Sequence, residues 1–305
     1  MTAGDYYGKY RQLNVRLANG VTIFGVDVHE YRNASDVFNK LNNDSDKTND
    51  VDEMPEDFDA GAGWKTGWGA LGGKIAQHGK LVGSNQYRLR LPLPTKANPT
   101  PSITLDEIIK TTELARVFTG KGTPELCAKA LQLAEAFGLV KPTVMAMQSY
   151  CDDFIGLDCN GFVGNYLQEI GCTLVGPETP AQPAYFTPPG KRLTKLEDIK
   201  ANSVLAWKAG GHVAIVDRII GRVLAPPKFN SYILRCDVCE STGARHDPTN
   251  IHTDGLHCVC YDFYPPSADG VFLVDRGLLS GGNMRSVNRG DGSGVLSAVY
   301  IANLK

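Results

Sequence analysis

The chain has 305 residues, with 31 Lys and Arg against 33 Asp and Glu, so its formal net charge is −2. This near-neutral balance argues against a dedicated nucleic-acid binder or a polybasic membrane binder. Hydrophobic residues make up 42% and charged residues 21%, an ordinary globular composition that excludes disordered, fibrous and collagen-like classes. No apolar run approaches the roughly 18 residues that would indicate a membrane span, so we expect none.

The N-terminal part of the chain predicts strands and then a loop. Two runs with alternating apolar residues, 13–17 and 21–28, flank Asn19-Gly20, which predicts a β-hairpin because both positions tolerate positive φ. Residues 42–59 are acidic and poor in apolar side chains, so we expect an exposed or disordered loop there. Residues 92–101 contain four prolines and suggest a linker. We therefore expect a small β-containing region over 1–95 and a second domain over 96–305.

Helical patterns precede strand patterns in the second part of the chain. Residues 105–118 are expected to form a helix capped by Thr104, with Glu107 in capping-box position. Thr123 and Pro124 start a second predicted helix that Gly138 ends. From about residue 203 the pattern changes to short β-type runs, which are SVLAW, HVAIVDRII, SYILRCDVCES, HCVCYDFY, GVFLVD and VLSAVYIA. Helices followed by strands are typical of an α+β domain.

Cys159 is the candidate nucleophile among the eight cysteines. The apolar spacing after it predicts a helix that begins at Cys159, and the first turn of a helix favours a thiolate over a thiol. A small buried cysteine at the start of a core helix is the alternative interpretation, and it is the commoner role. The N-terminus lacks the basic and apolar pattern of a signal peptide, so we expect reduced thiols.

His212 is the candidate base that a thiol nucleophile needs. It follows Gly210-Gly211 and begins a β-branched run that is predicted to be buried on both faces, whereas His257 begins a more polar run and is the nearest competitor. The alternative for His212 is a structural histidine at a strand edge.

Glu240 is the candidate third group, which would orient the imidazole. Alternation along residues 231–241 places it at the end of a mostly apolar face, where a carboxylate needs a partner. A pair with His212 would satisfy that need, and a solvated strand end is the open alternative.

These residues resemble the NlpC/P60 and CHAP group of papain-like cysteine peptidases and amidases. The family's Asp-Cys-Ser-Gly-Phe/Leu turn is matched by Asp-Cys-Asn-Gly-Phe from residue 158, and its Gly-His-Val-Gly/Ala-Ile-Val strand is matched by residues 211–216. The stretch SVLAWKAGG resembles the strand that precedes the family's histidine, and the Glu-Ser pair at 240–241 resembles the acidic position of CHAP members. The resemblance covers about residues 145–305, and Asn160 departs from the family's serine.

The resemblance implies an α+β, papain-like domain of NlpC/P60 type, with helices before an antiparallel sheet. It also implies amide or peptide hydrolysis, most often in peptidoglycan stem peptides, by Cys159, His212 and Glu240. Tyr150, Asp158 and Trp207 are implied near the oxyanion or substrate. We expect a peptide or peptidoglycan-fragment substrate, no cofactor, no nucleic-acid partner, and an unknown role for residues 1–95. The chain is expected to be soluble, and either cytoplasmic or exported without an N-terminal signal, as a secretion-system effector or a phage lysin would be.

Two other functions are open. A zinc-stabilised module would use four cysteines near the C-terminus, with histidines between the two pairs. Its cysteine ligands would be Cys236, Cys239, Cys258 and Cys260. A binding module with an inactive remnant of the site is the other alternative.

Overall fold

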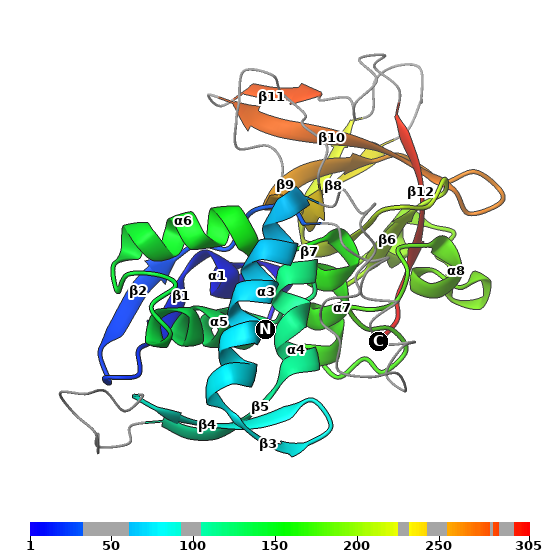
Figure 1. Cartoon of the computed structure of the whole chain (residues 1–305). Coiled ribbons are helices and arrows are strands. Elements are labelled where there is room, and N and C mark those ends of the chain that lie inside the picture. Colours follow the sequence, from blue (N-terminus) through cyan, green and yellow to red (C-terminus); the bar gives the residue numbers. More distant parts are fainter. Residues whose placement is uncertain (33–60, 93–104, 225–231, 243–254, 281–282, 287–295) are drawn as a thin grey trace. The chain divides into compact units, whose positions relative to one another are not determined.

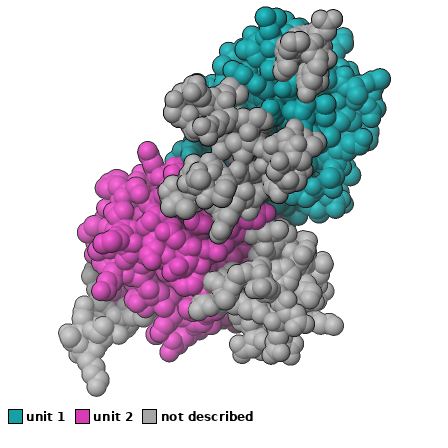
Figure 2. Space-filling view, turned by 90° about the horizontal axis from the view of Figure 1, so that it is seen from above, with its two compact units in different colours: residues 1–8, 158–305 teal, residues 9–157 magenta. Residues whose placement is uncertain are grey.

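The computed structural model describes residues 1–32, 61–92, 105–224, 232–242, 255–280, 283–286 and 296–305 (Figure 1). It divides into two compact units: unit 1 comprises residues 1–8 and 158–305, and unit 2 comprises residues 9–157 (Figure 2). The acidic segment 42–59 and nearly all of the proline-rich segment 92–101 lie outside the described residues. Among the described residues, no helix combines the length and the apolar character that crossing a membrane requires.

The division between the units lies at residue 157/158, whereas the sequence suggested a boundary near residue 95. Strand β4 (Gln86–Leu91) pairs antiparallel with β5 (Leu105–Lys110), so the chain on both sides of the proline-rich segment belongs to one sheet. Proline density indicated a connection here, but the connection joins two paired strands.

The N-terminal hairpin is confirmed in unit 2. Strands β1 (Leu13–Arg16) and β2 (Thr22–Val26) pair antiparallel, and Gly20 takes the positive φ of 86° that this turn requires. Unit 2 also contains α3 (Gly61–His78), α6 (Val144–Phe154) and the last turn of α1 (Ala3–Arg11), whose first residues belong to unit 1.

The predicted helix after Thr123 is confirmed as α5 (Pro124–Ala136). The Thr123 side chain accepts a hydrogen bond from the Leu126 amide at 3.3 Å, and Gly138 has a positive φ of 73°. The start and stop residues therefore act as the sequence indicated.

The helix predicted over residues 105–118 is wrong in its first half. Leu105–Lys110 is strand β5, and helical structure begins only with α4 (Thr111–Ala115) and the 3-10 turn Arg116–Thr119. The segment joins β4 and β3 (Lys80–Gly83) in a three-stranded sheet, and Arg88 Nε lies 2.7 Å from Asp106 Oδ1 across the two strands. Tertiary strand pairing overrides a weak local helix preference here. Thr104, the expected cap, lies outside the described residues.

Unit 1 consists of α7 (Cys159–Glu169), α8 (Pro183–Phe186), two short 3-10 turns and seven strands. The six predicted β-type runs are all strands. Their bounds are β6 (Val204–Trp207), β7 (Val213–Leu224), β8 (Tyr232–Thr242), β9 (Gly255–Phe263), β10 (Phe272–Ser280) and β12 (Ser297–Ala302), with β11 (Asn283–Ser286) beside β10. Helix α7 packs against β7 and β8.

The predicted α+β papain-like architecture is wrong, because the strands close into a barrel. The hydrogen-bonded order is β10-β12-β6-β7-β8-β9, and a further pairing of β10 with β9 closes this six-stranded antiparallel barrel (Figure 1). Closure depends on pairs such as Val274 with Phe263, which local alternation does not specify. The sequence thus indicated the strands and not their closure.

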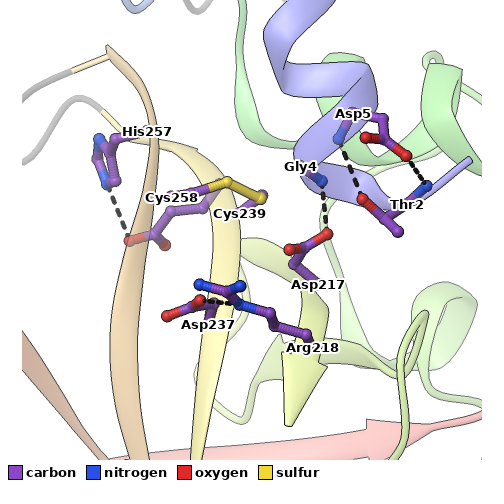
Figure 3. The surroundings of a disulfide bond; sticks show 10 residues. Thr2, Gly4, Asp5, Asp217, Arg218, Asp237, Cys239, His257 and Cys258 are labelled. Atoms are coloured by element: carbon purple, nitrogen blue, oxygen red, sulfur yellow. Dashed lines mark hydrogen bonds and ion pairs between the residues drawn. A yellow bond between two sulfur atoms is a disulfide. The ribbon is translucent and has the colours of Figure 1, made fainter. Parts of the chain in front are cut away.

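The barrel interior continues the apolar face that alternation predicted for β8. Leu234, Cys236 and Val238 belong to one buried cluster, and Glu240 is the next residue on that face. The opposite face carries ion pairs, with Arg218 Nε 2.5 Å from Asp237 Oδ2 (Figure 3). The cluster comprises Leu196, Ile199, Leu205, Trp207, Ala214, Val216, Leu234, Cys236, Val238, Tyr261, Phe263, Phe272, Val274, Val299 and Ile301.

The first residues of the chain contact strand β7. The Gly4 amide donates a hydrogen bond to Asp217 Oδ1 at 2.6 Å (Figure 3), and the Tyr6 ring lies 5.6 Å from that of Tyr166 on α7. A Cβ atom at position 4 would lie 3.0 Å from Asp217 Oδ2, so glycine permits this close approach.

The expectation that the cysteines are reduced thiols is wrong for one pair. Cys239 on β8 and Cys258 on β9 lie directly opposite each other and form a disulfide (Figure 3). The bond closes a loop with a sequence separation of 19.

We expect the double substitution Cys239→Ser, Cys258→Ser to lower the free energy of unfolding by about 2–4 kcal/mol, because the unfolded chain regains the freedom of this loop. Urea unfolding measures the change. A reductant should lower the urea concentration at the unfolding midpoint of the wild-type protein to that of the variant. It should leave the midpoint of the variant unchanged. Equal midpoints for the wild type and the variant would contradict this stabilising role.

Candidate active site

Cys159 is the first residue of α7, and Asp158 caps that helix. Asp158 Oδ1 accepts a hydrogen bond from the Gly161 amide at 2.6 Å, and both Asp158 and Cys159 are buried. The predicted helix start is confirmed. The carboxylate that the resemblance implied near the substrate therefore serves as the N-cap of the helix that begins at Cys159.

His212 lies at the end of a tight turn between β6 and β7. The Gly210 amide donates to the Trp207 carbonyl at 2.8 Å, and Gly210 and Gly211 have positive φ values of 79° and 77°. Side chains disfavour this backbone region, so two glycines suit the turn. Cys159 Sγ lies 4.0 Å from the carbonyl oxygen of Gly211, which places the thiol beside the residue that precedes His212.

Glu240 and His212 form a buried pair. His212 Nε2 lies 2.6 Å from Glu240 Oε2, and the glutamate has 0% relative exposure. Strands β7 and β8 pair antiparallel with Ile215 opposite Cys239, so Glu240 reaches the beginning of β7 although 28 residues separate it from His212. The structure thus brings together the two side chains that the sequence proposed as partners.

The second carboxylate oxygen of Glu240 has its own partners on β9. The Tyr261 hydroxyl donates to Glu240 Oε1 at 3.0 Å, and His257 Nε2 lies 3.2 Å from the same oxygen. Sequence reasoning considered His257 only as a rival base and did not single out Tyr261. Alternation along β9 places both on the face that pairs with Glu240, and that signal could have identified them.

Trp207 forms a wall of the imidazole site. Its ring centroid lies 4.5 Å from that of His212 in an edge-on arrangement and 6.4 Å from that of Tyr261. Trp207 therefore lies beside the imidazole, and its implied place near the oxyanion or substrate stays a prediction.

Tyr150 is not among the side chains that unit 1 assembles. It lies on α6 of unit 2, where burial, with the neighbouring Cys151, raises the pKa of its phenol. Its hydroxyl is buried and has no hydrogen-bond partner among the described residues.

Four other cysteines are poor nucleophiles because burial disfavours their thiolates. Desolvation raises the pKa of Cys236 to about 12 and that of Cys260 to about 11, with neighbouring charges adding to the shift. Burial also raises the pKa of Cys127 and of Cys151 well above the usual range. At neutral pH these four remain thiols.

The four candidate zinc cysteines do not converge as a ligand set in the described part of β8 and β9. Cys239 and Cys258 are joined to each other, while Cys236 pairs with Tyr261 and Cys260 pairs with Asp237. Cys236 and Cys260 therefore point to opposite faces of the strand pair.

A separate group in unit 2 has the composition of a metal site. The ligand atoms of His29, Glu30 and Asp152 all lie within 4.8 Å of one another. Hydrogen bonds to Asp27 and Glu30 raise the pKa of His29 to about 10. The imidazole is therefore protonated at neutral pH, and a protonated imidazole is a partner for carboxylates rather than a metal ligand.

Comparisons with protein-family models, with curated proteins and with solved structures give no match.

The capping role of Asp158 predicts how two substitutions differ. Asp158→Ala should lower the free energy of unfolding by about 0.5–2 kcal/mol, whereas Asp158→Asn keeps an oxygen acceptor and should lower it less. Thermal unfolding followed by circular dichroism measures both. Equal losses in the two variants would contradict the capping role, because both lack the carboxylate charge and only the Ala variant lacks the acceptor oxygen.

Proposed function

We propose that this chain is a thiol-dependent hydrolase that cleaves an amide or peptide bond with Cys159 as nucleophile, His212 as base and Glu240 as orienting acid. The buried contact between His212 and Glu240, with the Cys159 sulfur beside Gly211, is the observation that carries the proposal. It supplies the three roles of a nucleophile, a base and a group that orients the base.

The proposal gives different tasks to the two imidazole nitrogens. Nε2 of His212 faces Glu240, so the proposal gives Nδ1 the proton of Cys159. The Cys159 thiolate attacks the carbonyl carbon, and the positive end of α7 favours the negative charge at that position. As the C–N bond breaks, the imidazolium protonates the leaving amine. Water then hydrolyses the thioester, with His212 accepting its proton, and releases a carboxylic acid and the thiolate.

The burial of Glu240 suits it to orient His212. A carboxylate away from water needs donors, and an imidazolium gives it both a hydrogen bond and an opposite charge. The edge of the Trp207 ring also restricts the plane of the imidazole. Together these contacts hold His212 in one orientation before a substrate binds.

The motifs around Cys159 and His212 support a substrate class. They resemble those of NlpC/P60 and CHAP enzymes, whose usual substrates are peptidoglycan stem peptides. We therefore propose such peptides as the first substrates to test, on the motifs and not on the fold.

The disulfide supports one of the two expected locations. Disulfides persist in oxidising compartments and are rare in the cytosol. The Cys239–Cys258 bond therefore favours the proposal that the chain works after export, where peptidoglycan is accessible.

The proposed pair predicts selective alkylation of Cys159. At about pH 6, where an ordinary cysteine with a pKa of about 8.5 is protonated, iodoacetamide should label Cys159 faster than the other free cysteines. The rate should fall in His212→Ala, which loses the base, and fall less in Glu240→Gln, which retains a hydrogen-bonding side chain. Mass spectrometry of each cysteine-containing peptide measures the rates.

The chain provides its own controls for this experiment. Cys127, Cys151, Cys236 and Cys260 are thiols with raised pKa values and should label slowly in all three proteins. A Cys159 rate equal to theirs, or one that His212→Ala leaves unchanged, would contradict the proposed chemistry.

The substrate proposal predicts release of new amino groups from purified peptidoglycan by the wild-type protein and none by Cys159→Ser. Chromatography with mass spectrometry of the products identifies the bond. Release of reducing sugar ends without new amines would instead indicate glycan cleavage, and intact peptidoglycan would reject this substrate class while leaving the thiol chemistry to the alkylation test.

A further inference from the structure

The two carboxylate oxygens of Glu240 contact side chains from two different parts of the barrel. Oε2 lies 2.6 Å from His212 Nε2 at the start of β7, and Oε1 lies 3.2 Å from His257 Nε2 and 3.0 Å from the Tyr261 hydroxyl on β9. One buried carboxylate thus contacts two imidazoles, and only His212 adjoins Gly211, which lies beside the Cys159 sulfur.

The backbone fixes His257 opposite Glu240. The two residues are direct partners in the β8–β9 ladder, and the next pair along it is the disulfide-bonded Cys239 and Cys258 (Figure 3). His257 is only 13% exposed at its side chain. The covalent link beside the pair limits how far β9 can move from the carboxylate.

We infer that His257 is a positioning residue for the proposed active site: its Nε2 holds Oε1 of Glu240 on β9, so that Oε2 stays directed at His212. The inference rests on the proposed function and assigns a task to a residue outside its three-residue set. His257 would exchange no proton with the substrate, because the sulfur of Cys159 lies beside the residue that precedes His212.

The physical reason is that a carboxylate rotates readily about its terminal bond. This torsion has broad energy wells, so a single hydrogen bond to one oxygen does not fix the carboxylate plane. Donors on both oxygens do fix it. Loss of His257 would remove one of the donors to Oε1, weaken the restraint on the carboxylate plane and allow Oε2 to turn away from His212 more readily.

Three substitutions on the same face of β9 test this role. His257→Leu removes the donor, while His257→Gln replaces it with an amide N–H that can reach Oε1. Val259→Ala is the matched control, because Val259 lies two residues along the same face and packs against the barrel core.

Two readouts are used on each full-length variant with the disulfide intact. The first is the rate of Cys159 alkylation between about pH 5 and 9, a range in which the sulfur and the imidazoles of the site can titrate. In the described part of the chain, the groups in contact with the carboxylate include His212 before β7 and His257 and Tyr261 on β9, and Cys159 on α7 lies beside Gly211. The second readout is the nitrogen NMR signal of His212, which reports its bond to Glu240 without any reaction.

We expect His257→Leu to slow Cys159 alkylation about tenfold and to shift the His212 signal, since a buried acceptor loses a donor. His257→Gln should restore the rate to within about threefold of the wild type, and Val259→Ala should match the wild type. A His257→Leu protein that matches Val259→Ala in both readouts would overturn the inference. Equal losses in the Gln and Leu variants would also overturn it, because the donor would then be irrelevant.

A measurement on Glu240→Gln keeps the inference testable if His257→Leu does not fold. This substitution should change the Nε2 signals of both His212 and His257, since both lie against the carboxylate. An unchanged His257 signal would overturn the inference.

The two readouts also separate this inference from the proposed function. If Cys159 alkylates no faster than the buried thiols in the wild-type protein, the hydrolase proposal fails. The His212 signal in the variants still decides whether His257 positions Glu240.

Discussion

The candidate site depends on one buried charge, the carboxylate of Glu240. It continues the apolar inner face of β8 after Cys236 and Val238, where water cannot solvate it. An unpaired carboxylate at such a position would be strongly destabilising, so the fold must supply donors. It does so from two neighbouring strands, with His212 on one side of the carboxylate and His257 and Tyr261 on the other. The requirement of this one group therefore fixes the positions of the two imidazoles.

Local sequence signals were sufficient where a single element or a single hairpin decides the structure. Asn19-Gly20 specified its turn, Thr123 and Pro124 specified the start of α5, and alternation along β8 placed Glu240 on the inner face. The proximity of His212 and Glu240 followed because adjacent antiparallel strands place their inner faces together. Turn residues, capping residues and local periodicity are sufficient for these features.

The remaining features depend on contacts between segments that are far apart in the sequence, and local periodicity does not predict which segments pair. The pairing of β10 with β9 turns the sheet into a barrel, and the pairing of β5 with β4 turns an apparently helical segment into a strand. The disulfide is another such feature, because the sequence alone does not show that Cys239 and Cys258 are direct ladder partners. The role of Asp158 was also hidden, since the family motif does not distinguish a helix cap from a substrate contact.

The local environment of each cysteine distinguishes Cys159 from the other thiols. Burial keeps Cys127, Cys151, Cys236 and Cys260 protonated, whereas Cys159 combines a helix start with a neighbouring histidine turn. The same unit holds a disulfide on the strands that carry Glu240 and His257. Unit 1 thus contains both a reduced Cys159 and a disulfide-bonded pair of strands.

The ultraviolet absorbance of the thiolate tests the central claim most directly. The spectrum of the wild-type protein minus that of Cys159→Ser isolates the absorbance of this one sulfur, and the same difference is then taken in a His212→Ala background. The account predicts thiolate absorbance already at about pH 6, where an ordinary cysteine is protonated, and its loss without His212. Absorbance that rises only near the usual thiol pKa of about 8.5, with or without His212, would contradict it.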